Sequence, residues 1–316
     1  MSIKVRPYDR PQDYERIGQF LLDTYQPGDK PGNWLQARWE YMHYHPYMNQ
    51  SARDRIGVWE EDGDIVGVAN YEEQLGEAFF QIRPGYAHLK SKMLAYAEDH
   101  LFARLGDGRG YLRAYINDFD TEFESIAERQ GYRKRDDATQ PTTQYIITSP
   151  FPAIVVRDGF RLKSLDDDND LRKSDRVLWR GFNHPGEPPA DGIDGRKQMQ
   201  SAPNFRKDLN VVAVAPDGSF VSYSGIWYLS AHNIAYVEPV ATDPDYRRLG
   251  LGTAVVLEGI RRCGELGATV AFVGSDQEFY KVMGFTEVCV LYPWTKGFDP
   301  DTPAPRPHVR AGQLAD

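Results

Sequence analysis

The chain has 316 residues, of which 41% are hydrophobic and 13% aromatic, a size and composition that favour two domains with substantial cores. Its formal net charge of −9 argues against a nucleic-acid partner, which would require a basic face. The sequence has no apolar run of membrane-spanning length and only two cysteines, Cys263 and Cys289, too few for a metal cluster. From the residues Met1 to Lys4 we expect no signal peptide. We therefore expect a cytoplasmic protein with two buried, reduced thiols, no bound metal, and no membrane or nucleic-acid partner.

The first half alternates short strands with helices. Its expected elements are a strand at 3–6, helices at 12–24 and 33–44, strands at 56–59, 65–71 and 78–82, a helix at 89–101, a strand at 111–116, a helix at 121–130 and a strand that begins at Gly131-Tyr132. Gly63 supplies the positive φ that a hairpin turn at 61–64 requires.

The second half follows the same plan. Its expected elements are a helix at 171–182, a hairpin of strands at 211–215 and 220–229, a strand at 233–240, a glycine-bearing turn, a helix that ends at Gly267, a strand at 268–274 and a poorly ordered, Pro-rich tail at 299–316. The acidic run Asp166-Asp167-Asp168 is interpreted as a helix-start cap on a solvated face.

The stretch from Val240 to Ala254 organises the second half. A strand rich in β-branched and aromatic residues precedes it, and a helix with apolar residues at helical spacing follows it. The turn between them directs the free N–H groups of a helix start at one point, which favours phosphate binding. Gly250 and Gly252 would let an anion approach the backbone, and Arg247 and Arg248 would add charge at the rim.

The spacing Arg247-x-x-Gly250-x-Gly252 matches neither a Walker loop nor the dinucleotide-binding fingerprint. It resembles the pyrophosphate-binding motif of the GNAT N-acetyltransferase superfamily, and the segment 279–285 resembles the family's Tyr-x-x-x-Gly-Phe segment. The resemblance implies an α/β (α+β) fold with a mixed, mostly antiparallel central sheet flanked by helices. It also implies acetyl-CoA as co-substrate, bound by Val240, Ala241, Thr242, Arg247, Arg248, Leu249, Gly250, Leu251, Gly252 and Thr253.

The order of elements occurs twice, which predicts two tandem copies of this fold at 1–150 and 151–298, joined near Ser149-Pro150, with the tail at 299–316. The first copy has Pro84 where a cradle would need an N–H group, and Ala127 where the second copy has Tyr280. We therefore interpret the first copy as a degenerate, structural domain and the second as catalytic.

The family transfers an acetyl group directly to an amine, so the resemblance implies two acid–base roles. Tyr280 matches the family's general acid, which protonates the departing thiolate; the alternative is a core tyrosine. Glu238 is the expected general base, on the same strand face as Tyr236 and Val240 unless a bulge intervenes; the alternative is a surface carboxylate or a member of a water chain. His184 lies in the loop that the family uses near the acceptor, and is otherwise simply exposed.

The sequence thus predicts an N-acetyltransferase (EC 2.3.1.-) that acts on a primary amine of a small molecule, as a monomer or homodimer. Two alternatives stay open: a CoA-binding regulatory or sensor protein without turnover, and transfer of a longer acyl group or transfer to a protein N-terminus. The acceptor cannot be identified, because variable loops such as 183–200 determine it.

Overall fold

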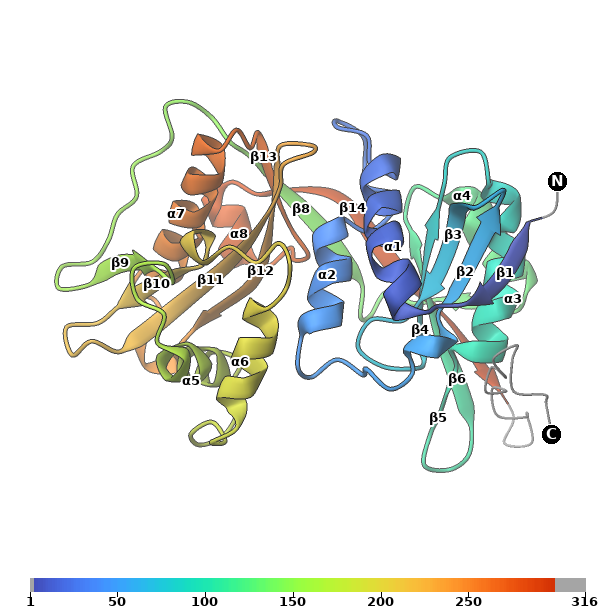
Figure 1. The fold of residues 1–316 in the computed structure, drawn as a ribbon, viewed down its shortest axis with the longest axis horizontal. Coiled ribbons are helices and arrows are strands. Elements are labelled where there is room, and N and C mark those ends of the chain that lie inside the picture. Colours follow the sequence, from blue (N-terminus) through green and yellow to red (C-terminus); the bar gives the residue numbers. More distant parts are fainter. Residues whose placement is uncertain (1–2, 299–316) are drawn as a thin grey trace. The chain divides into compact units, whose positions relative to one another are not determined.

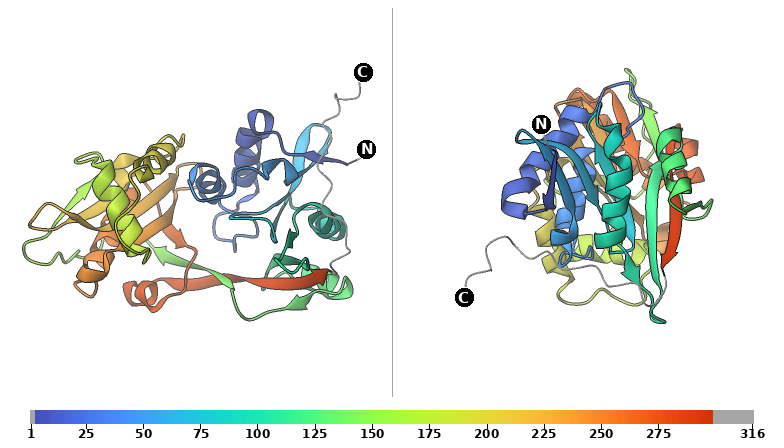
Figure 2. Two further views of the ribbon diagram at one scale, coloured as in Figure 1. Left: turned by 90° about the horizontal axis from the view of Figure 1, so that it is seen from below. Right: turned by 90° about the vertical axis from the view of Figure 1, so that its right-hand side faces the viewer.

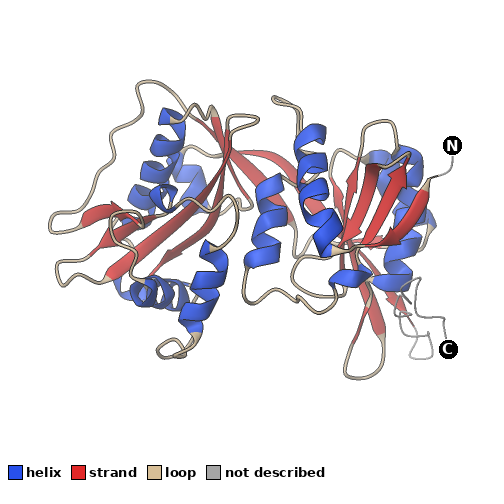
Figure 3. Cartoon of the chain, in the orientation of Figure 1, coloured by secondary structure: helices blue, strands red, loops and turns tan. Residues whose placement is uncertain are grey.

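A computed structural model describes residues 3–298, which fold into two compact units. Unit one contains residues 3–43, 47–140 and 289–298, and unit two contains residues 44–46 and 141–288. The tail expected at 299–316 lies outside the described residues. Each unit has a mixed, mostly antiparallel sheet with helices packed on it, as predicted (Figures 1 and 3).

Unit one has the strand order β1-β2-β3-β4-β6-β14, with β5 added on β6 and β7 on β14. All of these pairs are antiparallel except β4–β6. Its elements are β1 (Lys4–Pro7), α1 (Arg10–Thr24), α2 (Gln36–Tyr44), β2 (Gly57–Glu61), β3 (Asp64–Asn70), β4 (Glu77–Ile82), α3 (Lys90–His100), β5 (Ala103–Arg104), β6 (Gly110–Asn117), α4 (Thr121–Arg129), β7 (Arg133–Lys134) and β14 (Thr286–Phe298), whose first residues belong to unit two.

Unit two has the strand order β9-β10-β11-β12-β13-β8, in which only the β12–β13 pair is parallel. Its elements are β8 (Gln140–Ile146), β9 (Arg161–Ser164), α5 (Leu171–Gly181), α6 (Gly192–Gln200), β10 (Val211–Val214), β11 (Phe220–Leu229), β12 (Ile234–Thr242), α7 (Leu251–Glu265), β13 (Val270–Val273) and α8 (Glu278–Met283).

Helices cover both faces of the unit-two sheet, with α5 on one face and α7 on the other (Figures 1 and 2). Strand β10 is buried throughout, because alternate residues serve the two faces. Val211 and Ala213 pack with Val255 of α7, whereas Val212 and Val214 join a cluster that contains Val177 and Leu178 of α5.

The compact units differ from the continuous segments 1–150 and 151–298. Strand β8 comes before residue 150, yet it pairs with β13 in unit two, from Thr143–Val273 to Ile146–Val270. Strand β14, at the end of the described chain, pairs with β6 in unit one from Leu291–Asn117 to Phe298–Gly110. Each sheet is therefore completed by a strand from the other half of the sequence, which the repeat of the elements did not reveal.

Two local expectations need correction. The helix expected at 33–44 begins only at Gln36, and α5 is capped not by the run at 166–168 but by Asp170, whose carboxylate accepts hydrogen bonds from the N–H groups of Arg172 and Lys173. Both cysteines are buried and free, as predicted. Within residues 3–298, no helix has the length and apolar character needed to cross a bilayer.

Candidate active site

Strands β12 and β13 separate after a short parallel ladder. They pair at Ile234–Val270, Ala235–Ala271 and Tyr236–Phe272, after which β12 continues to Thr242 along its other neighbour, β11. In the described chain, no strand pairs with the β13-facing edge of β12 beyond Tyr236. We call the segment from Val237 to Thr242 the open edge.

The N–H and C=O groups along the open edge follow from the antiparallel pattern. The N–H of Asp243 donates to the carbonyl of Val221 on β11, so Thr242 and Val240, one and three residues earlier, direct their backbone groups away from β11. These two residues, expected to bind the co-substrate through their backbones, thus present them to the gap between β12 and β13. Ala241, between them, is buried against α5.

A β-bulge interrupts β12 just before these groups. The register jumps from Val237–Ile226 to Val240–Ser224, so that Glu238 and Pro239 lie opposite the single residue Gly225. A Cβ atom at Gly225 would lie 2.7 Å from the carbonyl oxygen of Glu238, so only glycine fits there without a shift.

This is the bulge that the sequence analysis allowed for, and it breaks the alternation that would have placed Tyr236, Glu238 and Val240 on one face. Val237 and Val240, which are three residues apart, contact the same hydrophobic cluster instead.

The turn that follows is built from left-handed residues. Arg248 has φ 63° and Gly250 has φ 78°. Helix α7 begins at Leu251, and in its first hydrogen bond the Ala254 N–H donates to the Gly250 carbonyl. Among the described residues, no backbone carbonyl accepts from the N–H groups of residues 248–253. These groups are the free donors of a helix start and form a cradle suited to an anion.

The two glycines of the turn have different roles. No atom lies within 4 Å of a Cβ placed at Gly250, so the chain leaves that side of the cradle open. A Cβ at Gly252 would lie 3.0 Å from Thr242 Oγ1 and 3.2 Å from the ring of Phe279. Gly252 is buried and permits close packing of α7, rather than approach of an anion.

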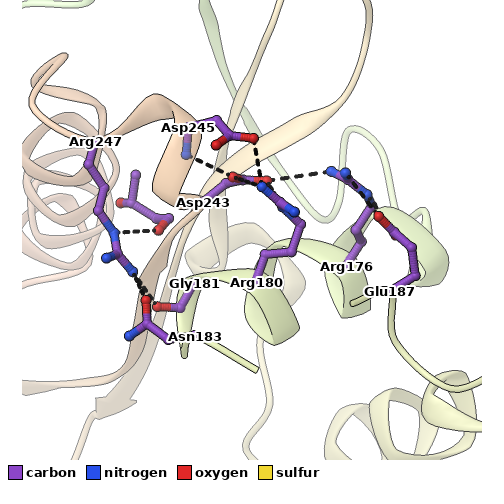
Figure 4. A network of polar contacts seen from close by, with 9 residues as sticks. Arg176, Arg180, Gly181, Asn183, Glu187, Asp243, Asp245 and Arg247 are labelled. Carbon is purple, nitrogen blue, oxygen red and sulfur yellow. Dashed lines mark hydrogen bonds and ion pairs between the residues drawn. The ribbon is translucent and has the colours of Figure 1, made fainter. Parts of the chain in front are cut away.

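The side chain of Arg247 extends toward Gly181 and Asn183 (Figure 4). Its Nε donates to the carbonyl of Thr242 at 3.2 Å, and its Nη2 donates to the carbonyl of Gly181 at 2.9 Å and to Asn183 Oδ1 at 2.8 Å. Arg248 is exposed, as is Arg247. Both arginines thus lie at the surface of the turn, and what sets Arg247 apart is the set of three protein oxygens that its guanidinium contacts.

An ion-pair network joins the same turn to α5 (Figure 4). Arg180 holds the carboxylate of Asp243 with two hydrogen bonds, of 2.6 and 2.9 Å, and also contacts Asp245 at 2.7 Å. Asp243 is 1% exposed and caps the short 3₁₀ helix Pro244–Tyr246 by accepting from the Asp245 N–H. Burial alone would raise the pKa of Asp243, but the hydrogen bonds from Arg180 and the Asp245 N–H outweigh it and lower the pKa below its ordinary value.

Sequence reasoning missed this network, although Asp243-Pro244 directly after a strand is a typical start of a capped turn.

Tyr280 lies on α8 in the hydrophobic cluster that also contains Val237 and contacts Val240. Burial, with a smaller contribution from the charge of Glu238, raises the pKa of Tyr280 above its ordinary value. The phenol is therefore held protonated. Glu238 lies in the bulge, half-buried, and its backbone carbonyl accepts a hydrogen bond from Trp227 Nε1 at 3.1 Å. The structure thus brings Tyr280 and Glu238 to the same stretch of the open edge.

Two other side chains considered from the sequence, Cys263 and His184, differ in burial. Burial raises the pKa of the Cys263 thiol to about 12, so this cysteine is no nucleophile. His184 is exposed and stacks on Trp179, with ring centroids 4.4 Å apart.

Unit one has the same parting of strands, but its open side is filled. The β4–β6 ladder contains only Glu77–Arg113 and Ala78–Ala114. Beyond it, the Ile82 N–H donates to Asn33 Oδ1 at 2.8 Å, and Asn33 Nδ2 donates to the Ile82 carbonyl at 3.0 Å. The carboxamide of Asn33 thereby occupies the backbone groups that correspond to those of Thr242 in unit two, a feature that the sequence did not indicate.

Comparison with solved structures identifies the fold as that of tandem acetyltransferases. The chain aligns with a tandem GNAT protein from the clavulanic acid biosynthesis pathway over 95% of its own length and 100% of that chain (TM-score 0.65, 14% identity). It aligns with a GCN5-related N-acetyltransferase from Sphaerobacter thermophilus over 93% and 95% of the two chains (TM-score 0.63, 14% identity). A GNAT-family acetyltransferase from Colwellia psychrerythraea aligns over 94% and 100% (TM-score 0.57, 10% identity).

At the sequence level, residues 177–285 match the model of the Acetyltransferase (GNAT) family. No curated protein sequence matches the chain. The matched residues include the second half of α5, the open edge, the glycine turn, α7 and Tyr280. Residues 177–285 are therefore similar to a GNAT-family domain, and the chain has the fold of the tandem GNAT protein.

Proposed function

We propose that unit two binds acetyl-CoA and transfers its acetyl group to a primary amine of a small molecule. The observation that carries this proposal is the continuity of two features: an unpaired strand edge leads directly into a cradle of free N–H groups at the start of α7. An extended amide-containing chain with a pyrophosphate at one end is complementary to both, because the edge offers strand-like hydrogen bonds and the cradle binds the anion.

Most of the expected binding residues then have a defined role. Val240 offers its backbone groups and Thr242 its N–H group to the pantetheine chain, since the Thr242 carbonyl accepts from Arg247 Nε, and the N–H groups of residues 248–253 surround the pyrophosphate. Leu249 and Leu251 pack on the cluster beneath α7 and fix the cradle. Arg248 supplies positive charge from the surface.

Tyr280 and Glu238 divide the proton transfers. The amine nitrogen attacks the thioester carbonyl, the carbon–sulfur bond breaks, and the sulfur takes the phenolic proton of Tyr280, while Glu238 accepts the proton that the nitrogen loses. Burial keeps the phenol of Tyr280 protonated, so that its hydroxyl can donate a hydrogen bond to the departing sulfur; the raised pKa also makes this phenol a weaker acid than an ordinary tyrosine, so full proton transfer follows only late in cleavage of the carbon–sulfur bond. Tyr280 packs in the cluster that contains Val237, the residue before Glu238, which supports their placement at one site.

The alternative functions differ from this proposal in whether an acyl group is transferred, in which acyl group it is, or in the acceptor, but all of them bind CoA or an acyl-CoA. A CoA-binding regulatory protein would share the open edge and the cradle, and so would an enzyme that transfers a longer acyl group or acetylates a protein N-terminus. For unit one we propose a structural role, supported by Pro84, by the buried Ala127 and by the Asn33 carboxamide on the Ile82 backbone. Cytoplasmic location and oligomeric state stay predictions.

Two measurements test the proposal. Titration calorimetry with acetyl-CoA should give one site per chain. A panel of small amines, assayed for release of CoA from acetyl-CoA, should then contain at least one that accelerates release. Absence of acetyl-CoA binding contradicts the proposal outright, whereas binding without turnover on any amine, peptide N-terminus or longer acyl-CoA favours the regulatory alternative.

A further inference from the structure

Arg247 is the first residue of the glycine-turn motif, yet its guanidinium has a set of partners that a phosphate ligand would not need. All three acceptors described above, the carbonyls of Thr242 and Gly181 and the amide oxygen of Asn183, are neutral oxygens. A guanidinium is a planar fork of donors, so one side chain can reach several oxygens that diverge in direction. Here the fork joins the end of β12 to the end of α5.

The charge of Arg247 is complemented by a helix end. Gly181 is the last residue of α5, so its carbonyl is one of those left without an intrahelical partner. Asn183 has φ 62° and terminates the helix, with its N–H bonded to the Arg180 carbonyl and that of His184 bonded to the Trp179 carbonyl. The negative end of the helix dipole thus lies where Arg247 places its positive charge.

The contact between these two chain segments is close. A Cβ atom on Gly181 would lie 2.6 Å from the Cβ of Ala241 and 3.0 Å from the backbone nitrogen of Thr242, so the end of α5 packs directly on the open edge. The Arg180–Asp243 ion pair fastens the preceding turn of the helix to the same place. Residues 182–191, which we call the α5–α6 loop, leave α5 at this point. Arg176 of α5 also reaches Glu187 of this loop at 3.0 Å.

We propose that Arg247 is a positioning residue: it holds the α5–α6 loop against the open edge and does not bind the pyrophosphate. This inference rests on the proposed function in one respect, that acetyl-CoA occupies the edge and the cradle. Arg247 belongs to the same turn as the cradle, so the position of the loop is linked to occupancy of the turn. Linkage is reciprocal: the factor by which acetyl-CoA stabilises the ordered loop equals the factor by which the ordered loop raises the affinity for acetyl-CoA.

The test uses the full-length protein with Arg247→Lys and Arg247→Gln, and Arg248→Gln as the matched control on the neighbouring, exposed arginine. Lysine keeps the charge that a phosphate ligand needs but cannot reach three diverging oxygens, so the two roles predict different results for it. The readouts are the affinity for acetyl-CoA by calorimetry and the hydrogen exchange of residues 182–191 with and without acetyl-CoA. If Arg247 only stabilised the fold, its replacement would change the exchange of residues 182–191 equally with and without acetyl-CoA, and the difference between the two measurements would stay the same.

If Arg247 positions the loop, the Lys and Gln variants behave alike. Because the coupling is reciprocal, the affinity for acetyl-CoA and the protection of the loop by acetyl-CoA fall by the same factor in both variants, about 5- to 10-fold. Arg248→Gln weakens acetyl-CoA binding but leaves loop protection intact. The inference is overturned if Lys restores the affinity that Gln loses, or if loop protection is unchanged in both variants. Should the wild-type protein not bind acetyl-CoA, the proposed function fails, but exchange of the loop in the unliganded variants still reports whether Arg247 holds it.

Discussion

Replacing Gly225 by alanine tests whether the bulge in β12 shapes the binding edge. The added Cβ would lie 2.7 Å from the Glu238 carbonyl oxygen and 2.9 Å from both Pro239 Cδ and Asn210 Oδ1, whereas ordinary van der Waals contact begins near 3.4 Å. Two of these three neighbours belong to backbone or a proline ring, so they cannot rotate away. The bulge must therefore shift by several tenths of an ångström.

The expected cost follows from the kind of atoms involved. Overpacking a well-packed interior costs about 1 to 3 kcal/mol, and a clash with backbone belongs in the upper half of that range, so we expect a loss of about 2 kcal/mol in the free energy of unfolding. The larger effect should fall on binding. Val240 lies directly after the bulge, and a change of register by one residue would turn its backbone groups away from the gap. Acetyl-CoA affinity should then fall by at least about 10-fold, or 1.4 kcal/mol.

Denaturant unfolding and calorimetry with acetyl-CoA measure the two effects. Gly106→Ala is the control, because Gly106 has no atom within 4 Å of the added Cβ and no positive φ. It should be neutral or slightly stabilising, since alanine restricts the unfolded chain. A Gly225→Ala protein with unchanged stability would show that the bulge adapts freely. One that is destabilised but binds acetyl-CoA normally would refute the link between bulge and site.

The other predictions concern residues of the site. Tyr280→Phe should lower kcat by about 100- to 10,000-fold with nearly unchanged acetyl-CoA affinity. Glu238→Gln should lower the rate, and the loss should be relieved at high pH, where free amine is plentiful. Normal turnover in either variant would reassign that residue to packing. Asp243→Asn should cost about 2 kcal/mol at pH 7, less than the usual loss for a buried pair because Arg180 is 23% exposed and regains hydration. The folded-state pKa of Asp243 is lowered, so the stabilisation by this carboxylate is present above the ordinary carboxyl pKa and is lost as the pH falls through the folded-state pKa. The difference in the free energy of unfolding between wild type and variant, measured by denaturant titration, should therefore shrink below about pH 4. A difference that does not depend on pH would contradict the ion pair. Gly250→Val should weaken acetyl-CoA binding and leave both units folded, as judged by circular dichroism, because φ 78° disfavours a β-branched residue only locally; unchanged affinity would exclude the cradle.

Local patterns in the sequence were sufficient for the strand, turn and helix at the centre of the site. Val256, Ile260 and Cys263 are buried on the predicted face of α7, and Gly250 adopts the left-handed conformation that a tight turn favours. In contrast, α6 contains Gly192 and Gly195 and has little apolar periodicity, so the sequence did not predict it.

Features that depend on a distant partner could not be read from the sequence. The bulge at Glu238 depends on a glycine in the neighbouring strand, and the role of Arg247 depends on where α5 ends. The Asn33 carboxamide lies 49 positions from the backbone that it contacts. In each case the relevant signal is a contact across the fold, and a single sequence carries no direct record of such contacts.

The exchange of strands between the halves has a consequence for how the protein is made. Strand β6 pairs with β14 from Asn117–Leu291 onwards, so the sheet of unit one lacks its last long strand until the end of the described chain has left the ribosome. A nascent chain that has emerged only to residue 150 would expose β6 as an unpaired sheet edge. Strand β8 would also be unpaired, because β13 has not yet been synthesised. Such long-range pairing slows folding and favours association between incomplete chains. Completion of unit one therefore waits until residues 286–298 have emerged, and cells that produce the protein at a high rate should need chaperones that bind the first half until then.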